Sequence, residues 1–388
     1  MAVDVHWESI HEAWDANNVE FLVAFCPTGR PAARPEADLL EDFGDAADEV
    51  NVEAEERWLD HSPFIEDAAD TTAGGAIALM NTAGDDGEVQ ACLRQLAERL
   101  TLQGWAGQVR GAPPVHPPGW ATSVDAVGRA LGLFLRFIPA DTNDPEPRHE
   151  TLSRHDLATL RDLADRWATR PATSTYLTRS MFTDIAPSHD LGAEFLQAVE
   201  RHRRAGLQWI DDEHRSTTTI DLGYGTSAIF AIASRTETWH TRLDTLTRIL
   251  QDLGPRLEVG LIDTANPMPI SWTDLRTRPN PGSDQLNSID DLDVAREHIP
   301  DAYGLQVLTS THLAKAHDLS AWTITDLGNE RHLVQHPDPA AWFAHQDPDP
   351  QVIAAARHDF GDIILTPERY TAILDAKRPP NPAAAAEA

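Results

Sequence analysis

The sequence predicts an α+β protein made of two or three small units, each an α/β sandwich with an antiparallel or mixed sheet covered by helices. Two observations lead to this class. Short runs of β-branched and aromatic residues alternate with amphipathic runs of helical period. Two breaks rich in proline and glycine, at 111–119 and 277–284, divide the chain. The units share a strand, helix, strand rhythm, which is compatible with an old duplication.

The predicted N-terminal unit, residues 1–112, is an acidic α+β unit. Its patterns predict, in order, a helix over 7–16, strands over 19–26 and 76–80, a helix over 88–103 and a strand over 105–110. The second helix is the best defined, because Val89, Leu93 and Leu96 fall on one side of it. Gly104 then ends it.

The central and C-terminal units are predicted over residues 120–270 and 285–378. In the central unit the patterns predict a strand over 131–138, helices over 153–167 and 191–209, two strands within 217–234, a helix over 236–253 and a strand over 256–263. In the C-terminal unit they predict strands over 303–308, 323–327 and 332–335. Residues 379–388, PPNPAAAAEA, form a low-complexity tail that we expect to be mobile.

The charge balance limits the partners. The chain has 31 Lys and Arg against 62 Asp and Glu, a formal net charge of −31. A field of this sign repels phosphate backbones and anionic lipid headgroups, so we expect neither nucleic acid nor membrane as a partner. A basic protein is the partner that this charge favours.

Cysteine usage and the N-terminal sequence predict a cytoplasmic protein. The two cysteines, Cys26 and Cys92, are too few for a disulfide framework. The first residues, MAVDVHWE, lack the basic and apolar regions of a secretory signal. No apolar run approaches the roughly 18 residues that a membrane-spanning helix needs.

A dense acidic segment between residues 36 and 56 is the strongest candidate site. The residues that we expect to contact a partner are Glu41, Asp42, Asp45, Asp48, Glu49, Glu53, Glu55 and Glu56. Repulsion within such a run costs stability, and a cationic partner would relieve it. A merely solvated surface is the alternative.

The stretch HLVQHPDPAAWFAHQDPD, residues 332–349, has the residue types of a metal site. Two histidines four residues apart share a face of a helix, but Pro337 pushes His336 toward extended geometry. In a strand, His332 and His336 lie roughly 13 Å apart, too far for one ion. We therefore predict a strand followed by turns, and no metal site. The aspartates expected to form turns or cap helices are Asp338, Asp347 and Asp349.

Four other motifs have a structural explanation, so we assign no catalytic residue and no cofactor. Cys26-Pro-Thr-Gly-Arg30 has a spacing similar to that of arsenate-reductase-like thiol enzymes, but Pro31 opposes the helix expected there. The others are predicted to be a solvated helix end (Asp211–His214), a hairpin bend (Gly223–Ser227) and a helix start with capping residues (His149, Ser153, His155 and Asp156).

The C-terminal third resembles bacterial immunity-type proteins encoded beside polymorphic or secreted toxins. The resemblance is carried by the apolar spacing of residues 299–308, His312-Leu313, Trp322 and residues 332–343. It implies a non-enzymatic α+β protein that binds and blocks a toxin. The acidic composition fits this, since a basic cleft would be complementary to it.

These observations favour a non-enzymatic, acidic protein-binding protein of immunity or inhibitor type that neutralises a basic partner. Two other classes stay open. One is an enzyme that uses thiol chemistry at Cys26. The other is a structural or assembly component of a phage or secretion apparatus.

Overall fold

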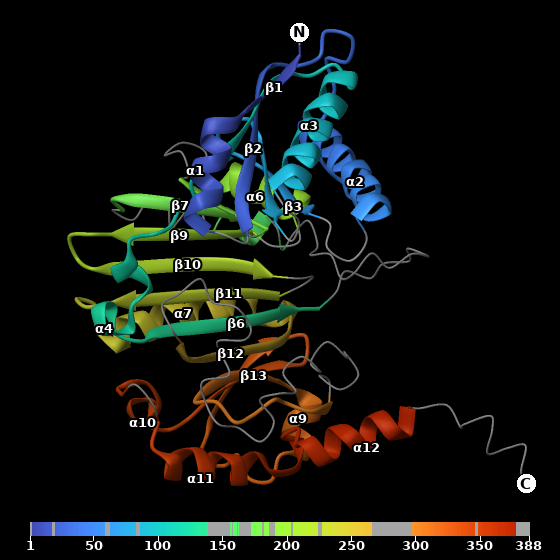
Figure 1. The fold of residues 1–388 in the computed structure, drawn as a ribbon. Helices are drawn as coiled ribbons and strands as arrows, with labels where there is room; N and C mark the ends of the chain where they lie inside the picture. Colours follow the sequence, from blue (N-terminus) through green and yellow to red (C-terminus); the bar gives the residue numbers. More distant parts are fainter. Residues whose placement is uncertain are drawn as a thin grey trace, which may run out of the picture. The chain divides into compact units, whose positions relative to one another are not determined.

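The chain is an α+β protein with two sheets, as the sequence predicts (Figure 1). The computed structural model describes residues 2–17, 20–58, 63–82, 86–138, 156, 158–160, 162, 172–180, 182–185, 191–202, 205–223, 227–265, 297–345 and 348–377. The chain divides into two compact units. Unit 1 contains Met1–Pro117, Arg161–Arg170 and Ser174–Leu207, and unit 2 contains Pro118–Leu160, Pro171–Thr173 and Gln208–Ala388.

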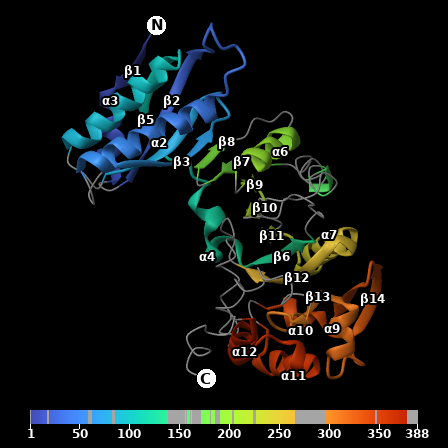
Figure 2. The ribbon, with the colours of Figure 1, turned by 90° about the vertical axis from the view of Figure 1, so that its right-hand side faces the viewer.

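The N-terminal part of unit 1 is built on a five-stranded mixed sheet. Its elements are β1 (Val3–His6), α1 (Trp7–Asn17), β2 (Glu20–Gly29), α2 (Leu39–Trp58), β3 (Phe64–Asp70), β4 (Ala76–Asn81), α3 (Asp86–Leu102) and β5 (Ala106–Ala112). The strand order is β1-β5-β2-β4-β3, in which β1 runs parallel to β5 and the other neighbours are antiparallel. Figure 2 shows α2 and α3 side by side along this sheet.

The core of this sheet lies on one face. Along β2, Phe21, Val23 and Phe25 are buried, whereas Leu22 and Cys26, which point to the other face, are only partly covered. The buried residues belong to one cluster that includes apolar side chains from α1, α2 and α3. The three helices therefore share one hydrophobic core.

Gly111 lets α1 lie directly against β5. A Cβ at this position would lie 2.1 Å from the Ser9 carbonyl oxygen and 2.8 Å from the Ala13 Cβ. No larger residue fits there without moving the helix away from the strand. This glycine thus fixes how closely α1 covers the sheet.

Unit 1 also includes a later segment with β7 (Ser174–Arg179), β8 (Phe182–Ile185) and α6 (Leu191–Arg201). The sequence predicts one helix over 191–209, and this is wrong in its second half, because β9 begins at Ala205. Residues Ala205–Ile210 are all buried. A strand buried on both faces has no alternation of apolar and polar residues, so its pattern looks like a continuation of the helix.

The second sheet has ten strands in the order β14-β15-β13-β12-β6-β11-β10-β9-β7-β8. Its remaining strands, and the helices that lie before, between or after them in the chain, are α4 (Val124–Val127), β6 (Ala130–Phe137), β9 (Ala205–Asp211), β10 (Ser216–Gly223), β11 (Ser227–Ser234), α7 (Trp239–Leu253), β12 (Leu257–Ala265), β13 (Leu305–Thr309), α9 (Ser310–Lys315), β14 (Thr323–Gly328), β15 (Arg331–Gln335), α10 (Pro339–Phe343), α11 (Pro350–Phe360) and α12 (Pro367–Lys377).

Strands from the predicted central and C-terminal units are neighbours in this sheet. β12 pairs with β6 on one side and with β13 on the other, both antiparallel. The predicted strand pair within 217–234 is the antiparallel hairpin of β10 and β11. The tail, 379–388, lies outside the described residues. Among the helices that the structure describes, none is long and apolar enough to cross a bilayer.

Candidate functional site

The acidic segment contains α2, an amphipathic helix that the sequence patterns did not predict. Its buried side consists of Phe43, Ala46, Ala47, Val50 and Ala54. Three of these are alanines, so the hydrophobic period is weak even though the spacing is helical. The Asp38 carboxylate accepts a hydrogen bond from the Leu40 backbone N–H at 3.0 Å, as a residue at the start of a helix does.

The outer side of α2 presents most of the predicted acidic residues to solvent. Besides the basic Arg57 in the last turn, the exposed side chains, which we call the α2 acidic face, are Glu41, Asp45, Asp48, Glu49, Val52, Glu55 and Glu56. At about 100° per residue they lie within roughly one third of the helix circumference. Val52 is 57% exposed, and carboxylates lie one turn before it and one turn after it.

Asp42 does not belong to this surface, which corrects the sequence prediction. It is only 4% exposed. Its carboxylate accepts hydrogen bonds from Arg34 Nη2 at 2.9 Å and from the Trp105 indole Nε1 at 2.8 Å. Asp42 therefore holds α2 to the rest of unit 1 and is not accessible to a partner.

Glu53 is also partly removed from the surface. It accepts a hydrogen bond from Gln95 Nε2 at 3.0 Å and forms an ion pair with Arg99, both on α3. Arg99 Nη1 also lies 3.1 Å from Glu49 Oε2. α3 therefore neutralises one edge of the acidic helix, and Glu41, Asp45, Asp48, Glu55 and Glu56 remain as its outward charges.

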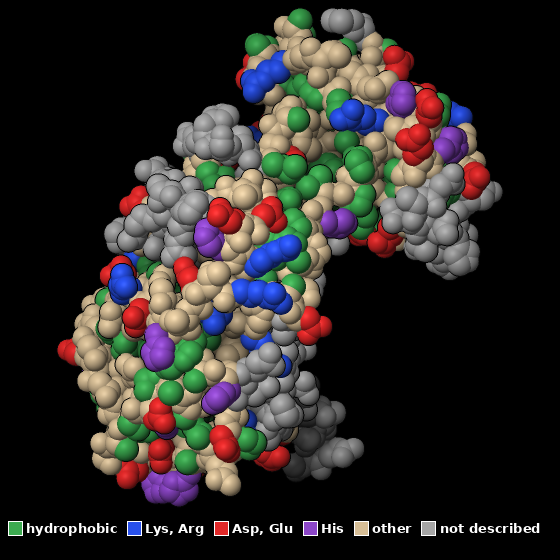
Figure 3. All heavy atoms as spheres, turned by 90° about the vertical axis from the view of Figure 1, so that its left-hand side faces the viewer, with side chains coloured by type: hydrophobic (Ala, Val, Ile, Leu, Met, Phe, Trp, Pro, Cys, Tyr) green, Lys and Arg blue, Asp and Glu red, His purple; other side chains and the backbone are tan. Residues whose placement is uncertain are grey.

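Over part of the described surface, acidic side chains do not form a continuous face like that of α2. On the face drawn in Figure 3, acidic, basic and histidine side chains are intermixed over the described surface. The net charge alone therefore does not produce a uniform acidic coat. A continuous acidic face on one helix is a local feature.

A second candidate site in unit 1 is a polar cavity of about 550 Å³, which we call the unit 1 cavity. It is lined by the end of β2, the start of α2, the turn between β3 and β4, and residues of β7 and α6. Its charged lining residues are Arg30, Asp38, Asp70, Arg179, Glu194 and Arg201. Sequence reasoning missed this site, because its residues lie far apart in the chain and share no motif.

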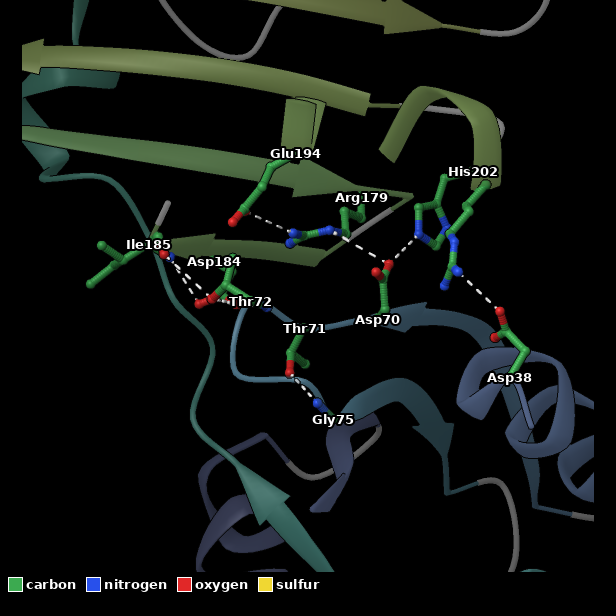
Figure 4. A network of polar contacts seen from close by, with 11 residues as sticks. Asp38, Asp70, Thr71, Thr72, Gly75, Arg179, Asp184, Ile185, Glu194 and His202 are labelled. Carbon is green, nitrogen blue, oxygen red and sulfur yellow. Dashed lines mark hydrogen bonds and ion pairs between the residues drawn. The ribbon is translucent and has the colours of Figure 1, made fainter. Parts of the chain in front are cut away.

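A row of charged side chains runs along the unit 1 cavity (Figure 4). Arg179 lies between Glu194 and Asp70, with Nη2 3.6 Å from Glu194 Oε2 and Nε 3.5 Å from Asp70 Oδ1. His202 Nε2 lies 2.7 Å from the same Asp70 oxygen. An ionised carboxylate only accepts hydrogen bonds, so Nε2 is the nitrogen that carries the proton.

Burial and hydrogen bonding act in opposite directions on Asp70. Burial raises its pKa, but the hydrogen bond from His202 and the charges of Arg179, His202 and Arg201 outweigh this and hold the pKa below its ordinary value of 3.8. Asp70 is therefore ionised at neutral pH. It fixes the positions of Arg179 and His202.

Two further contacts shape the walls of the cavity. The Thr72 hydroxyl donates to Asp184 Oδ2 at 2.5 Å, and the Thr72 backbone N–H donates to the same oxygen at 2.9 Å. Arg201 Nη2 lies 2.9 Å from Asp38 Oδ2. The start of α2 and the turn before β4 are thus tied to β8 and α6, as Figure 4 shows.

The cysteines take no part in the unit 1 cavity. Cys26 lies within β2, which continues to Gly29, and it is paired in register with Gln108 of β5. The Arg30 guanidinium donates to the Pro35 carbonyl oxygen at 2.9 Å. Cys92 is buried in the core, and burial raises the pKa of its thiol to about 12.

The histidine-rich stretch forms the predicted strand and turns. His332 is the second residue of β15, and its side chain hydrogen-bonds the Ser310 hydroxyl; His336 directly follows β15, and its side chain hydrogen-bonds the backbone of Asp338. Asp338 caps α10, and Asp349 caps α11. Asp347 lies outside the described residues. In the part of the chain that the structure describes, no group of three or more His, Cys, Asp or Glu could hold a metal.

The remaining motifs include the predicted bend Gly223–Ser227, of which residues 224–226 lie outside the described residues. Asp211–His214 lies at the β9–β10 turn, not at a helix end, and His214 Nδ1 lies 2.8 Å from Asp211 Oδ2. Asp156 is buried and forms an ion pair with Arg256. His149, Ser153 and His155 are outside the described residues.

No protein-family model matches this chain, and no curated protein matches it.

Proposed function

We propose that this chain is a non-enzymatic protein-binding protein that docks a basic partner protein on the α2 acidic face, in the manner of an immunity protein or inhibitor. The observation that carries the proposal is the arrangement of α2. Five outward carboxylates and an exposed Val52 lie on one side of the helix, with Asp48, Glu55 and Glu56 within about one turn of Val52, while the opposite side of the helix packs into the core.

The arrangement combines two elements that protein interfaces use. Burial of an exposed apolar side chain against a partner contributes a favourable free energy to binding. The surrounding carboxylates steer a cationic surface to it and fix its orientation. Because the core holds α2 in place, the charges are ordered before binding, and less conformational entropy is lost on association.

The net charge of −31 supports a basic protein over nucleic acid or an anionic membrane. Thiol chemistry at Cys26 has weaker support, since Cys26 lies within a strand and Arg30 is engaged with a carbonyl oxygen. An assembly role has no single feature of the described residues in its favour.

The test is an affinity purification of the tagged protein from native lysate at low and high salt. We expect one basic protein at near one-to-one ratio, retained at low salt and released by high salt, because screening shortens the range of charge attraction to about 3 Å at 1 M. The triple variant Asp45→Asn, Asp48→Asn, Glu55→Gln should lose this partner.

A matched control removes the same charge elsewhere. Asp244→Asn, Asp252→Asn, Glu237→Gln changes two Asp and one Glu that are exposed on or beside α7 in unit 2. It should retain the partner. Equal loss in both triple variants would mean that only the total charge matters, and capture that ignores both salt and the α2 changes would refute the proposal.

A further inference from the structure

The unit 1 cavity is lined by a buried cation whose side chain makes no hydrogen bond to the described residues. The Arg179 side chain is 6% exposed and lines the cavity. Its contacts with Asp70 and Glu194, at 3.5 and 3.6 Å, are ion pairs too long for good hydrogen bonds. It makes no hydrogen bond to any residue within the described ranges. A guanidinium has five N–H donors, so donors of Arg179 remain for a ligand in the cavity that it lines.

Next to Arg179 lies a carboxylate oxygen that also has no hydrogen bond to the described residues. Glu194 Oε2 is buried and has no hydrogen-bond partner among the described residues, and its nearest cation is Arg179 Nη2. The Glu194 side chain as a whole is 27% exposed and lines the same cavity. A donor group and an acceptor group without hydrogen bonds therefore lie side by side at the cavity wall.

The charges of the whole cavity wall cancel. Three arginines, Arg30, Arg179 and Arg201, face three carboxylates, Asp38, Asp70 and Glu194. A dianion such as phosphate would meet Asp70 and Glu194 directly beside Arg179, and a divalent cation would meet the guanidinium itself. Both are disfavoured by like-charge repulsion in a partly desolvated site. A ligand with both signs of charge suits the wall better.

We infer that the unit 1 cavity binds a free α-amino acid, with the carboxylate on Arg179 and the ammonium group on Glu194. In an α-amino acid the two charged groups are attached to one carbon, which matches a guanidinium and a carboxylate that lie side by side. The cavity volume of about 550 Å³ falls in the range of small-molecule sites. It leaves room for a side chain near Leu39, Leu40 and Trp105, which also line it.

His202 and Asp70 have a positioning role in this site. Asp70 accepts from His202 and holds Arg179 from the side opposite to Glu194. The guanidinium is therefore held between two carboxylates, with its remaining donors available to the ligand. This inference does not depend on the partner proposed for the α2 acidic face.

The experiment measures the melting temperature of the full chain with each of the twenty L-amino acids at constant pH and ionic strength, and separately with acetate, methylammonium and inorganic phosphate. At least one amino acid should raise the melting temperature by about 2 °C or more, because a ligand that binds only the folded state stabilises it. Acetate and methylammonium, each carrying one of the two charges, should give smaller shifts.

Variants locate the binding. Calorimetric titration of the most effective amino acid should show at least about tenfold weaker binding to Glu194→Gln and to Arg179→Gln, since each loses one charged contact. Glu200→Gln, an exposed glutamate on the same helix, and Arg248→Gln, an exposed arginine on α7, are the matched controls and should bind normally. Glu194→Gln keeps the test decisive if loss of the buried Arg179 impairs folding.

Three results would overturn the inference. The first is that no amino acid exceeds the shift given by acetate. The second is that phosphate stabilises the protein more than every amino acid, which would make the cavity a simple anion site. The third is that binding is unchanged in Glu194→Gln, which would place the amino acid elsewhere on the chain.

Discussion

At the scale of single residues, the charged groups in unit 1 divide into those that hold the fold and those that remain available. Asp42 and Asp45 are three residues apart on α2, yet one is buried against Trp105 and the other faces solvent. Asp42 and Asp45 lie only about 60° apart around the helix, so the difference arises because Arg34 and Trp105 cover Asp42 and no described residue covers Asp45. The roles of the eight predicted carboxylates therefore differ although their chemistry is the same.

Asp42→Ala should lower the free energy of unfolding by about 1 to 3 kcal/mol, because it leaves the Trp105 indole N–H buried without an acceptor. Asp45→Ala, on the exposed side, should not lower it, because this carboxylate supports no buried group among the described residues. Urea titrations of both variants measure this. Equal effects would show that Asp42 is not the structural carboxylate that its burial indicates.

The two cysteines should differ in reactivity. Cys92 is buried with its thiol pKa raised to about 12, so its thiolate is about a thousandfold scarcer than that of an ordinary thiol. In the native protein at pH 8, a thiol reagent such as DTNB should modify Cys26, which is partly exposed, and leave Cys92 unmodified. Both should react in 8 M urea, and Cys26→Ser should abolish the native reaction. Native labelling of Cys92 in intact-mass spectra would contradict its burial.

Asp70 should make the protein less stable in acid. Its pKa in the folded state is below the ordinary 3.8, so its contribution to stability is present above 3.8 and is lost as the pH falls through the folded value. Asp70→Asn should therefore be less stable than the parent at about pH 6, and the difference should shrink toward pH 3. Urea unfolding at a series of pH values measures this. A difference that stays constant would mean that ionisation of Asp70 is not the cause.

At the scale of elements, sequence patterns located helices and strands that contain short runs of large apolar residues. The helix predicted over 88–103 is α3, and the strand predicted over 131–138 is β6. They failed for α2, whose buried side is mostly alanine, and for β9, which is buried on both faces. The buried side of α2 is marked mainly by small residues, and the apolar residues of β9 follow those of α6 so closely that one helical pattern covers both.

Repulsion along the α2 acidic face should be measurable as stability. Like charges three and four residues apart on a helix destabilise it by about 0.2 to 0.5 kcal/mol per pair. The triple variant Asp45→Asn, Asp48→Asn, Glu55→Gln should therefore be more stable than the parent by about 0.5 to 1.5 kcal/mol at low ionic strength. The gain should fade in 0.5 M NaCl, and urea unfolding at both salt concentrations measures it. A gain that is independent of salt would point to helix propensity as the cause.

At the scale of the whole molecule, the net charge of −31 is a property of every fold that this chain could adopt. Self-repulsion of this size opposes the compact state, and salt screens it. The melting temperature should therefore rise when NaCl is increased from about 0.05 to 0.5 M, without any partner present. Differential scanning calorimetry measures this. A melting temperature that falls with NaCl would mean that surface ion pairs such as Arg99 with Glu49 outweigh the repulsion.

The sequence by itself determined the α+β class, the excess of negative charge and the acidic segment as a candidate surface, because these follow from composition and local spacing. Only the tertiary structure decided which carboxylates face solvent, and it alone brought Arg179 and Glu194 to the same cavity as Asp38 and Asp70. Contacts between residues more than a hundred positions apart depend on how strands pair and helices pack. No local pattern in the chain records that arrangement.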